Sequence, residues 1–494
     1  MDNNSRRKHK TVQELAKAPS YISGLDEILY GGLPEGRTTL LEGGPGTGKS
    51  IVGMEFLYRG ALVGETGIFV AFEERADSVR RNAGTLGWDL EALEKADKLA
   101  IIEARMDPET VVSGDFNLKA LLAIIEGQSK AIGAKRIVFD ALDVLMRLFD
   151  NSNRERSELY YLNEWLLDHK MTAILTLKAS GGNTVFDRYE FLEFMADCVI
   201  RLIQRPGEWV ATRELQIIKY RGSDFGRNAY PVVIQPGGIS VIPISEFGLE
   251  HQAMGPHDSS GNEQMDSVLG GGYRRGSAIL IAGSSGTGKT TVAVTFVKAA
   301  CDRGEKVLYL SFEESEAAIV TTMLSPGIDL RPAIKKGFLK VMTAMPEAFG
   351  TEKHLVRTFK MIEEFKPDHV VVDAISSFER MGSDRAAFEF AMRLTNRCKD
   401  KGITLIMTNQ SSGGSDDRIA ISGVGISSII DALLWLRFIE EGNRLKRKLL
   451  VVKSRGSKHS SQYHDFRITD HGIEVEVPNE SAGDASESSK EIRK

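Results

Sequence analysis

Short runs of apolar residues alternate along this chain with longer segments in which apolar residues recur at helical spacing. The segments 136–140 and 369–373 each contain a continuous apolar run that ends in an aspartate. Such runs are typical of strands that are buried on both faces of a parallel sheet. Further strands are predicted at 38–41, 68–72, 173–177 and 215–219, and at 278–281, 307–312, 403–408 and 449–452.

These predicted elements occur twice in the same order, which indicates an internal duplication. The segment 24–32 reads G-L-D-E-I-L-Y-G-G, and its counterpart at 265–272 reads M-D-S-V-L-G-G-G. Alternation of strands and helices predicts an α/β fold in which each copy is a mainly parallel sheet flanked by helices. We place the domains at 19–246 and 265–477, the linker at 247–264, and disordered tails at 1–18 and 478–494.

A glycine-rich loop follows the first predicted strand of each copy. Both loops fit the pattern G-x-x-x-x-G-K-[ST], in which backbone N–H groups surround phosphate oxygens and the lysine reaches the β- and γ-phosphates. We therefore predict that each domain binds ATP with Mg²⁺. The residues assigned to nucleotide binding are Gly44, Pro45, Gly46, Thr47, Gly48, Lys49 and Ser50 in the first copy, and Ser284, Ser285, Gly286, Thr287, Gly288, Lys289, Thr290 and Thr291 in the second.

The aspartates that end two of the predicted strands are candidate metal-positioning residues. Ligands of open parallel sheets bind at the carboxyl ends of the strands, so Asp140 and Asp373 should lie near the glycine-rich loops. There they would position Mg²⁺ together with the hydroxyls of Ser50 and Thr290. For an aspartate in isolation, a helix cap or a turn is the alternative.

A pair of adjacent glutamates follows another predicted strand in each copy. The pairs are Glu73–Glu74 and Glu313–Glu314. Because side chains alternate along a strand, only one glutamate of each pair is expected to face the γ-phosphate. A carboxylate there can polarise a water for hydrolysis or accept a proton from a hydroxyl.

A basic pair recurs near the end of each domain, as Lys219 with Arg221 and as Lys453 with Arg455. Two residues apart on a strand, the side chains share one face. They could neutralise transition-state charge on a phosphate, which in ring assemblies usually belongs to the neighbouring subunit. The alternative is a strand edge that is protected by basic residues.

The composition narrows the class of protein. The chain has 494 residues, of which 42% are hydrophobic and 27% charged, and it contains no apolar run long enough to span a membrane. Its net charge of −5 gives no general attraction to nucleic acid. The basic segment 6–10 has no apolar stretch behind it, so a cytoplasmic protein is expected. Neither disulfides nor zinc are suggested by the three scattered cysteines, Cys198, Cys301 and Cys398.

Together these motifs resemble the KaiC family, within the RecA-like ATPase superfamily. The resemblance covers roughly 19–477 and rests on the duplicated lead-in segments, glycine-rich loops, glutamate pairs and K-x-R-G segments. It implies tandem RecA-like domains that assemble into a double-ring homo-hexamer with ATP between subunits. It further implies a slow ATPase in the N-terminal ring and an autokinase and autophosphatase in the C-terminal ring.

The resemblance also implies which hydroxyls are phosphorylated. They lie in the segment after the last core strand of the second domain, and matching Asp431 and the apolar run behind it places them at Ser427 and Ser428. The clock proteins of the family carry a serine–threonine pair there. Glu313, or alternatively Glu314, would act as the base. Glu73 or Glu74 would activate water in the first ring, and the four basic residues would act in trans.

Partners and context follow from the same resemblance. It implies a clock or stress-signalling role and a possible KaiB-type partner on the first ring. Dependence on a KaiA-type partner is not expected, because the tail after 477 has no match to the segment that such a partner uses. Two other functions stay open: a DNA-acting recombinase or helicase, and a nucleotide-gated signalling scaffold. The acidic net charge and the lack of a basic, aromatic-studded loop disfavour binding to DNA.

Overall fold

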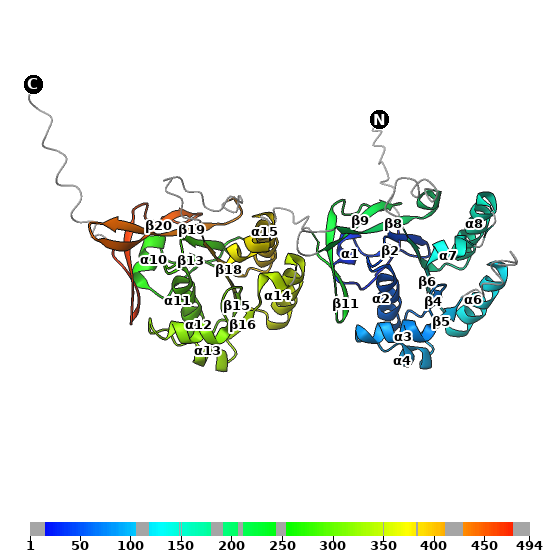
Figure 1. Cartoon of the computed structure of the whole chain (residues 1–494), viewed down its shortest axis with the longest axis horizontal. Coiled ribbons are helices and arrows are strands. Elements are labelled where there is room, and N and C mark those ends of the chain that lie inside the picture. The colour runs from blue at the N-terminus through cyan, green and yellow to red at the C-terminus, as the bar shows by residue number, and fades with distance from the viewer. Residues whose placement is uncertain are drawn as a thin grey trace, which may run out of the picture. The chain divides into compact units, whose positions relative to one another are not determined.

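The computed structural model describes residues 15–104, 118–147, 149, 151–178, 191–205, 211–243, 253–348, 350–381, 384–410 and 428–477. The chain divides into two units, Met1–Glu246 and Phe247–Lys494. Each unit contains one large sheet with helices around it (Figure 1). The predicted α/β class with two tandem, mainly parallel sheets is confirmed.

The large sheet of the first unit has nine strands in the order β11-β10-β9-β8-β3-β7-β6-β4-β5. The strands from β8 to β5 are parallel to their neighbours, and β9 to β11 extend the sheet as an antiparallel edge. Their bounds are β3 (Thr38–Gly43), β4 (Gly67–Ala71), β5 (Leu99–Glu103), β6 (Arg136–Asp140), β7 (Thr172–Lys178), β8 (Cys198–Arg205), β9 (Thr212–Tyr220), β10 (Ala229–Gln235) and β11 (Gly238–Val241).

The second unit repeats this topology. Its sheet has the order β16-β15-β17-β18-β14-β19-β20-β21-β22, in which β14 takes the place of β3. The strands are β14 (Ala278–Gly283), β15 (Val307–Ser311), β16 (Leu339–Thr343), β17 (His369–Asp373), β18 (Thr404–Gln410), β19 (Ala432–Glu441), β20 (Arg444–Ser454), β21 (His464–Thr469) and β22 (Gly472–Val475).

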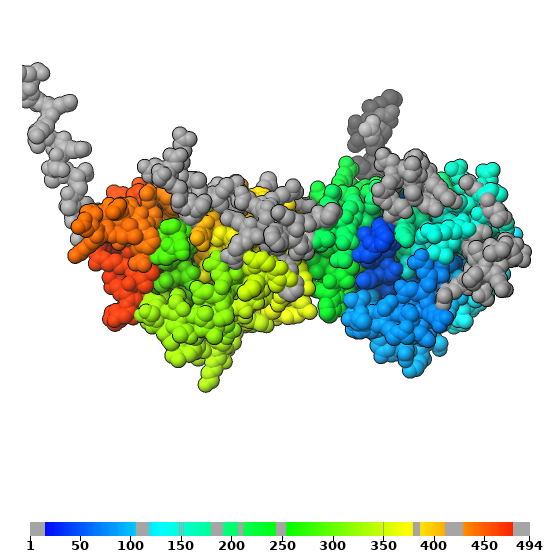
Figure 2. Space-filling model, in the orientation of Figure 1, coloured from blue at the N-terminus to red at the C-terminus, as the bar shows by residue number. Residues whose placement is uncertain are grey.

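Helices cover both faces of each sheet, because the central strands are apolar on both sides. In the first unit, one apolar cluster contains Phe56 and Leu57 of α2, and another contains Leu122 of α6 and Leu162 of α8. Figure 2 shows the surface of the two units in the same orientation as Figure 1. The helices are α1 (Leu25–Ile28), α2 (Lys49–Leu62), α3 (Ala76–Thr85), α4 (Leu90–Lys95), α6 (Leu118–Ile132), α7 (Leu142–Met146), α8 (Ser152–Asp168), α10 (Glu263–Leu269), α11 (Lys289–Asp302), α12 (Glu316–Met323), α13 (Arg331–Lys335), α14 (Thr351–Phe365) and α15 (Asp384–Asp400), with 3₁₀ segments η1 (Pro346–Ala348) and η2 (Ile375–Met381).

The structure differs from the predicted tail and linker at two points. β1 (Lys17–Ala18) pairs with β2 (Leu33–Pro34), and β12 (His257–Asp258) pairs with β13 (Tyr273–Arg274). The end of the tail over 1–18 and the second half of the linker over 247–264 are therefore parts of the folded units. These strands are two residues long and pair through their backbones, so their side chains carry no apolar pattern that could predict them.

An aspartate in each lead-in segment ties these outer strands to the first helix. Asp26 accepts hydrogen bonds from the backbone N–H groups of Ser20 (2.7 Å) and Tyr21 (2.9 Å). Asp266 accepts from the N–H of Ser260 (2.7 Å) and from the hydroxyl of Ser259 (2.5 Å). The aspartate of the lead-in motif is thus a structural residue.

We expect Asp266→Ala to lower the free energy of unfolding of the second unit by about 1–3 kcal/mol, because the buried N–H group of Ser260 loses its acceptor. Chemical denaturation measures this loss. Asp302→Ala is the control, since Asp302 is exposed and, among the residues that the structure describes, forms an ion pair only with Lys298 of the preceding helical turn. This substitution should cost less than about 0.5 kcal/mol. Equal effects of the two substitutions would contradict the structural role of Asp266.

Candidate nucleotide site in each repeat

The glycine-rich loop of each repeat connects the central strand to a 14-residue helix. β3 ends at Gly43 and α2 begins at Lys49; β14 ends at Gly283 and α11 begins at Lys289. The last loop glycine has φ 104° at Gly48 and φ 102° at Gly288, a backbone conformation that other residues rarely adopt. A Cβ at Gly48 would also lie 2.9 Å from Ile234. The loop therefore delivers free N–H groups of a helix N-terminus to one point, which is a binding site for phosphate.

The loop lysines lie against the loop backbone. Lys49 Nζ donates to the carbonyls of Gly43 (2.8 Å) and Gly44 (2.9 Å), and Lys289 Nζ donates to that of Ser284 (2.9 Å). Burial lowers the pKa of both lysines below the ordinary value, and nearby carboxylates, above all those of Asp140 and Asp373, oppose this shift. A bound phosphate would add negative charge beside these half-buried ammonium groups.

In the second repeat the predicted metal-positioning pair is in direct contact. Thr290 Oγ1 donates to Asp373 Oδ2 at 2.9 Å, and the hydroxyl of Tyr309 donates to the same oxygen at 2.7 Å. Asp373 Oδ1 accepts from the hydroxyl of Thr408. Hydroxyl and carboxylate oxygens are the ligands that Mg²⁺ prefers, so Thr290 and Asp373 fit a site for this ion.

In the first repeat Ser50 and Asp140 line one cavity of about 300 Å³, together with Glu74. Asp140 accepts a hydrogen bond of 2.5 Å from Thr176 Oγ1. The rest of the wall is mostly apolar and comes from α2, α3 and β4, including Met54 and Phe69. A polar end beside the phosphate-binding loop and an apolar remainder suit a nucleotide, whose base is less polar than its phosphates.

The two glutamates of each pair have different surroundings. Glu73 and Glu313 each lie close enough to the loop lysine for their negative charge to oppose the lowering of its pKa by burial. Glu313 also accepts a hydrogen bond of 2.9 Å from Ser377 Oγ. Glu74 accepts from Asn82 Nδ2 at 3.0 Å, and the pKa of Glu314 is raised by burial and then by Asp373 and Glu313. The first glutamate of each pair is the one that lies near the loop lysine, whereas Glu74 lines the cavity that contains Ser50 and Asp140. In the second repeat Glu313 is therefore the better candidate to face the γ-phosphate, and in the first repeat both glutamates stay candidates.

The basic pairs contact the segment that precedes β8 or β19 in their own unit. Lys219 Nζ donates to the carbonyl of Ala196 at 2.7 Å, and Arg221 donates to that of Phe194 at 2.5 Å. Lys219 also donates to Phe194, so the two side chains share one face, as their spacing predicts. The second repeat repeats this arrangement at the carbonyls of Ile430 (2.8 Å, from Lys453) and Ser428 (3.3 Å, from Arg455).

The strand register separates this basic pair from the loop of the same repeat. Lys219 lies opposite Val199 of β8, which in turn lies beside Leu40 of β3. The glycine-rich loop begins after Gly43, about 10 Å further along the strand. The glycine-rich loop, the glutamate pair and the strand-end aspartate thus lie at the carboxyl ends of the parallel strands. The basic pair lies towards the amino ends of these strands.

Of the predicted phosphorylation sites, Ser427 lies outside the described residues. Ser428 is exposed, and its backbone carbonyl is the acceptor of Arg455.

Sequence reasoning missed one contact that recurs in both repeats. Arg213 Nε of β9 donates to the carbonyl of Gly46 at 3.1 Å, and Arg447 Nε of β20 donates to that of Gly286 at 3.3 Å. These arginines hold the glycine-rich loop from the neighbouring part of the sheet. The sequence signal for these arginines is that they recur at equivalent positions, six residues before Lys219 and Lys453.

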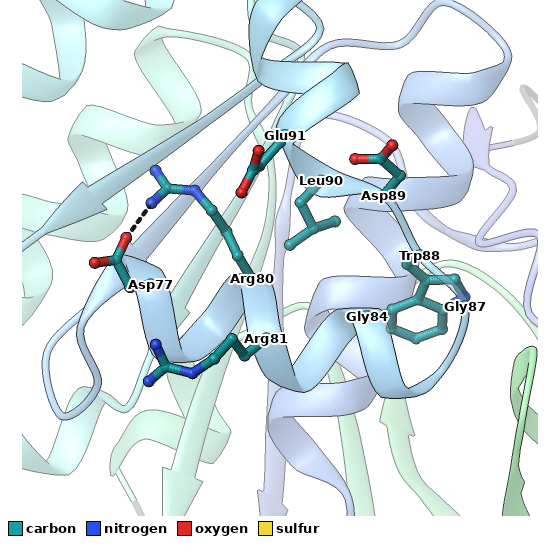
Figure 3. Close-up of a pocket in the computed structure, with 9 residues that line it drawn as sticks. All are labelled: Asp77, Arg80, Arg81, Gly84, Gly87, Trp88, Asp89, Leu90 and Glu91. Atoms are coloured by element: carbon teal, nitrogen blue, oxygen red, sulfur yellow. Dashed lines mark hydrogen bonds and ion pairs between the residues drawn. The ribbon is translucent and has the colours of Figure 1, made fainter.

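Two other features carry charge but are internally neutralised. A cavity of about 480 Å³ lies beside α3 and α4, where Arg80 forms an ion pair of 2.7 Å with Asp77 (Figure 3). Arg80 also forms an ion pair of 2.7 Å with Glu94. Asp258 and Glu305 lie near His369 in a group that could hold a metal, but the guanidinium of Arg275 forms ion pairs with both carboxylates. Neither group belongs to the nucleotide site.

No helix within the described parts of the chain is both long and apolar enough to cross a membrane.

Comparison with known proteins agrees with this site. A family model described as the KaiC ATPase matches residues 18–246 and again 259–480. The circadian clock protein KaiC2 of Synechocystis sp. is 39% identical over 467 residues, 93% of this chain and 81% of the relative. The circadian clock protein KaiC3 of the same organism is 34% identical over 470 residues, 94% and 92% of the two chains. The circadian clock oscillator protein KaiC of Synechococcus elongatus is 34% identical over 465 residues, 94% and 89%.

Because burial lowers the pKa of Lys49 and Lys289, ATP binding should take up protons at alkaline pH. The ammonium form is favoured beside phosphate, so the pKa rises on binding, and affinity falls as the pH rises through the lowered pKa of the free protein. Calorimetry in buffers of different ionisation enthalpy measures the uptake. Lys289→Arg combined with Lys49→Arg is the control, because guanidinium stays charged. Equal uptake in that variant would contradict the assignment.

Proposed function

Because this chain belongs to the KaiC family of ATPases, we propose that its two repeats divide the chemistry. The first repeat hydrolyses ATP, and the second transfers the γ-phosphoryl group of ATP to serines of the same protein, Ser427 and Ser428.

One observation supports this division of labour. Arg221 donates to the carbonyl of Phe194, and Arg455 makes the same contact with that of Ser428, so Phe194 and Ser428 are equivalent positions. By the same register, Glu193 corresponds to Ser427. A carboxylate and a phenyl ring in the first repeat stand where the second has two hydroxyls. Only the second repeat offers an acceptor for a phosphoryl group here.

The transfer step uses the residues at the carboxyl ends of the parallel strands of the second sheet. The loop N–H groups and Lys289 hold the phosphates of ATP. Thr290 and Asp373 would hold Mg²⁺, which supplies charge neutralisation to the phosphates. Glu313 accepts the proton of the serine hydroxyl as its Oγ bonds to the γ-phosphorus. The bond between that phosphorus and the β–γ bridging oxygen breaks, and ADP leaves.

In the first repeat the acceptor is water. Lys49 holds the phosphates, Ser50 and Asp140 would hold Mg²⁺, and Glu73, or alternatively Glu74, orients and polarises the water that attacks the γ-phosphorus. The products are ADP and phosphate.

The basic pairs favour a ring in which ATP lies between subunits. Lys453 and Arg455 donate hydrogen bonds to the acceptor segment of their own chain. They lie towards the amino ends of the parallel strands, whereas the loop of their own repeat lies at the carboxyl ends. We infer that they present this segment to the ATP of a neighbouring subunit, and that Lys219 and Arg221 act in trans in the same way. A double-ring homo-hexamer satisfies this geometry.

The relatives are named circadian clock proteins, so we place this protein in a clock or stress-signalling context in the cytoplasm. A KaiB-type protein is the partner to test on the first ring.

Peptide mass spectrometry after incubation with ATP and Mg²⁺ tests the autokinase. Phosphate is expected on Ser427 or Ser428 of the wild type, and Lys289→Ala should reduce it about 10²-fold or more, because the γ-phosphoryl group loses its cation. Lys49→Ala is the matched change in the first repeat and should lower ATP hydrolysis while phosphate on the serines persists. ATP hydrolysis by the wild type without phosphate on either serine would refute the autokinase.

A further inference from the structure

Two buried hydroxyls contact the carboxylates of the second site. The hydroxyl of Tyr309 donates to Asp373 Oδ2 at 2.7 Å, and Ser377 Oγ donates to Glu313 Oε1 at 2.9 Å. Tyr309 is 1% exposed and Ser377 is fully buried. Neither side chain can therefore reach a substrate directly, but each fixes a group that the proposed reaction uses.

The first repeat has apolar side chains at both positions. Phe69 is the third residue of β4, as Tyr309 is of β15. Val144 stands four residues after Asp140, as Ser377 stands four residues after Asp373. Neither Phe69 nor Val144 can donate a hydrogen bond. The two repeats thus share the strand order around these positions and differ in the hydroxyls behind their carboxylates.

We propose that Tyr309 and Ser377 are positioning residues that adapt the second repeat to a serine acceptor. Ser377 orients the carboxylate of Glu313 toward the hydroxyl that is to be deprotonated, and Tyr309 fixes the carboxylate of Asp373. This inference rests on the proposed autokinase function.

The physical reason lies in the acceptor. A water molecule can reach the γ-phosphorus in many orientations and adjust to its base. A serine is attached to a chain and approaches along one path, so its base must already point at the hydroxyl within hydrogen-bond reach.

The carboxylate of Asp373 is also held in one orientation by hydrogen bonds. Its Oδ2 atom accepts from both Thr290 and Tyr309, and its Oδ1 atom accepts from Thr408. If Thr290 bound a metal ion instead, Tyr309 and Thr408 would still hold the carboxylate in place. Outer partners of this kind typically change metal affinity or activity by about 10–100-fold when they are removed.

The test compares Ser377→Ala and Tyr309→Phe in the full-length protein. Ser377→Ala should slow phosphate incorporation into Ser427 and Ser428 about tenfold, with the KM for ATP unchanged within about twofold. Tyr309→Phe should raise the Mg²⁺ concentration for half-maximal incorporation by about tenfold. ATP hydrolysis by the first repeat should stay at the wild-type rate in both variants.

Matched controls separate positioning from packing. Ser376 is the neighbouring serine, and its Oγ accepts from the N–H of Gln410 instead of contacting Glu313, so Ser376→Ala should keep the wild-type rate. Tyr273 is another buried tyrosine of this unit, and no hydrogen-bond partner of its hydroxyl is found among the described residues, so Tyr273→Phe should have no effect. Thermal unfolding of all four variants reports any loss of folding.

A double-mutant cycle tests whether Ser377 acts through Glu313. In a Glu313→Gln background, Ser377→Ala should have no further effect on the residual rate, because the group that it orients is already gone. Wild-type rates in Ser377→Ala, or equal losses in Ser377→Ala and Ser376→Ala, would overturn the positioning role while leaving the autokinase intact. Absence of phosphate in the wild type would overturn the autokinase and this inference together.

Discussion

The register between the central strand and its neighbours is the constraint on which the functional account depends. In each repeat this register places the glycine-rich loop, the glutamate pair and the strand-end aspartate together at the carboxyl ends of the parallel strands. The same register places Lys219 opposite Val199 of β8, at the level of Leu40 in the first half of β3, with Arg221 just beyond it. Lys453 and Arg455 occupy the matching positions of the second sheet. The basic pair of the first repeat therefore lies about 10 Å along the strand from the loop of its own repeat. Proposals about neighbouring subunits follow from this separation.

The two units are copies of one scaffold that differ in single functional groups. Strand order, loop geometry and the contacts of Arg213 and Arg447 are the same in both units. The differences lie in single functional groups, such as Ser428 in place of Phe194 and Tyr309 in place of Phe69. Replacing an apolar side chain with a hydroxyl leaves the backbone unchanged and yet alters which reactions the site supports. We regard these exchanges as the basis for dividing hydrolysis and serine phosphorylation between the repeats.

Much of this arrangement could be predicted from sequence, because its signals are local. Continuous apolar runs that end in aspartate predicted β6 and β17, and the loop motif requires glycine at positions with positive φ, such as Gly48 and Gly288. β1 and β12 could not be predicted, because two-residue strands pair through backbone atoms alone. The loop contacts of Arg213 and Arg447 were missed for another reason. The sequence around an arginine on a partly exposed strand does not indicate which group the arginine contacts. The contact with the loop depends on the strand register in the folded protein.

Mixing two inactive variants tests the central claim most directly. Chains with Lys453→Ala and Arg455→Ala keep the glycine-rich loop, whereas chains with Lys289→Ala keep the basic pair. Combined before ATP is added, they should form sites from one loop and one basic pair, so phosphate should return to Ser427 or Ser428 of the Lys289→Ala chains. If both variants are inactive alone and the mixture stays unphosphorylated, or if the Lys453→Ala, Arg455→Ala chains alone match the wild type, the account of sites shared between subunits is wrong.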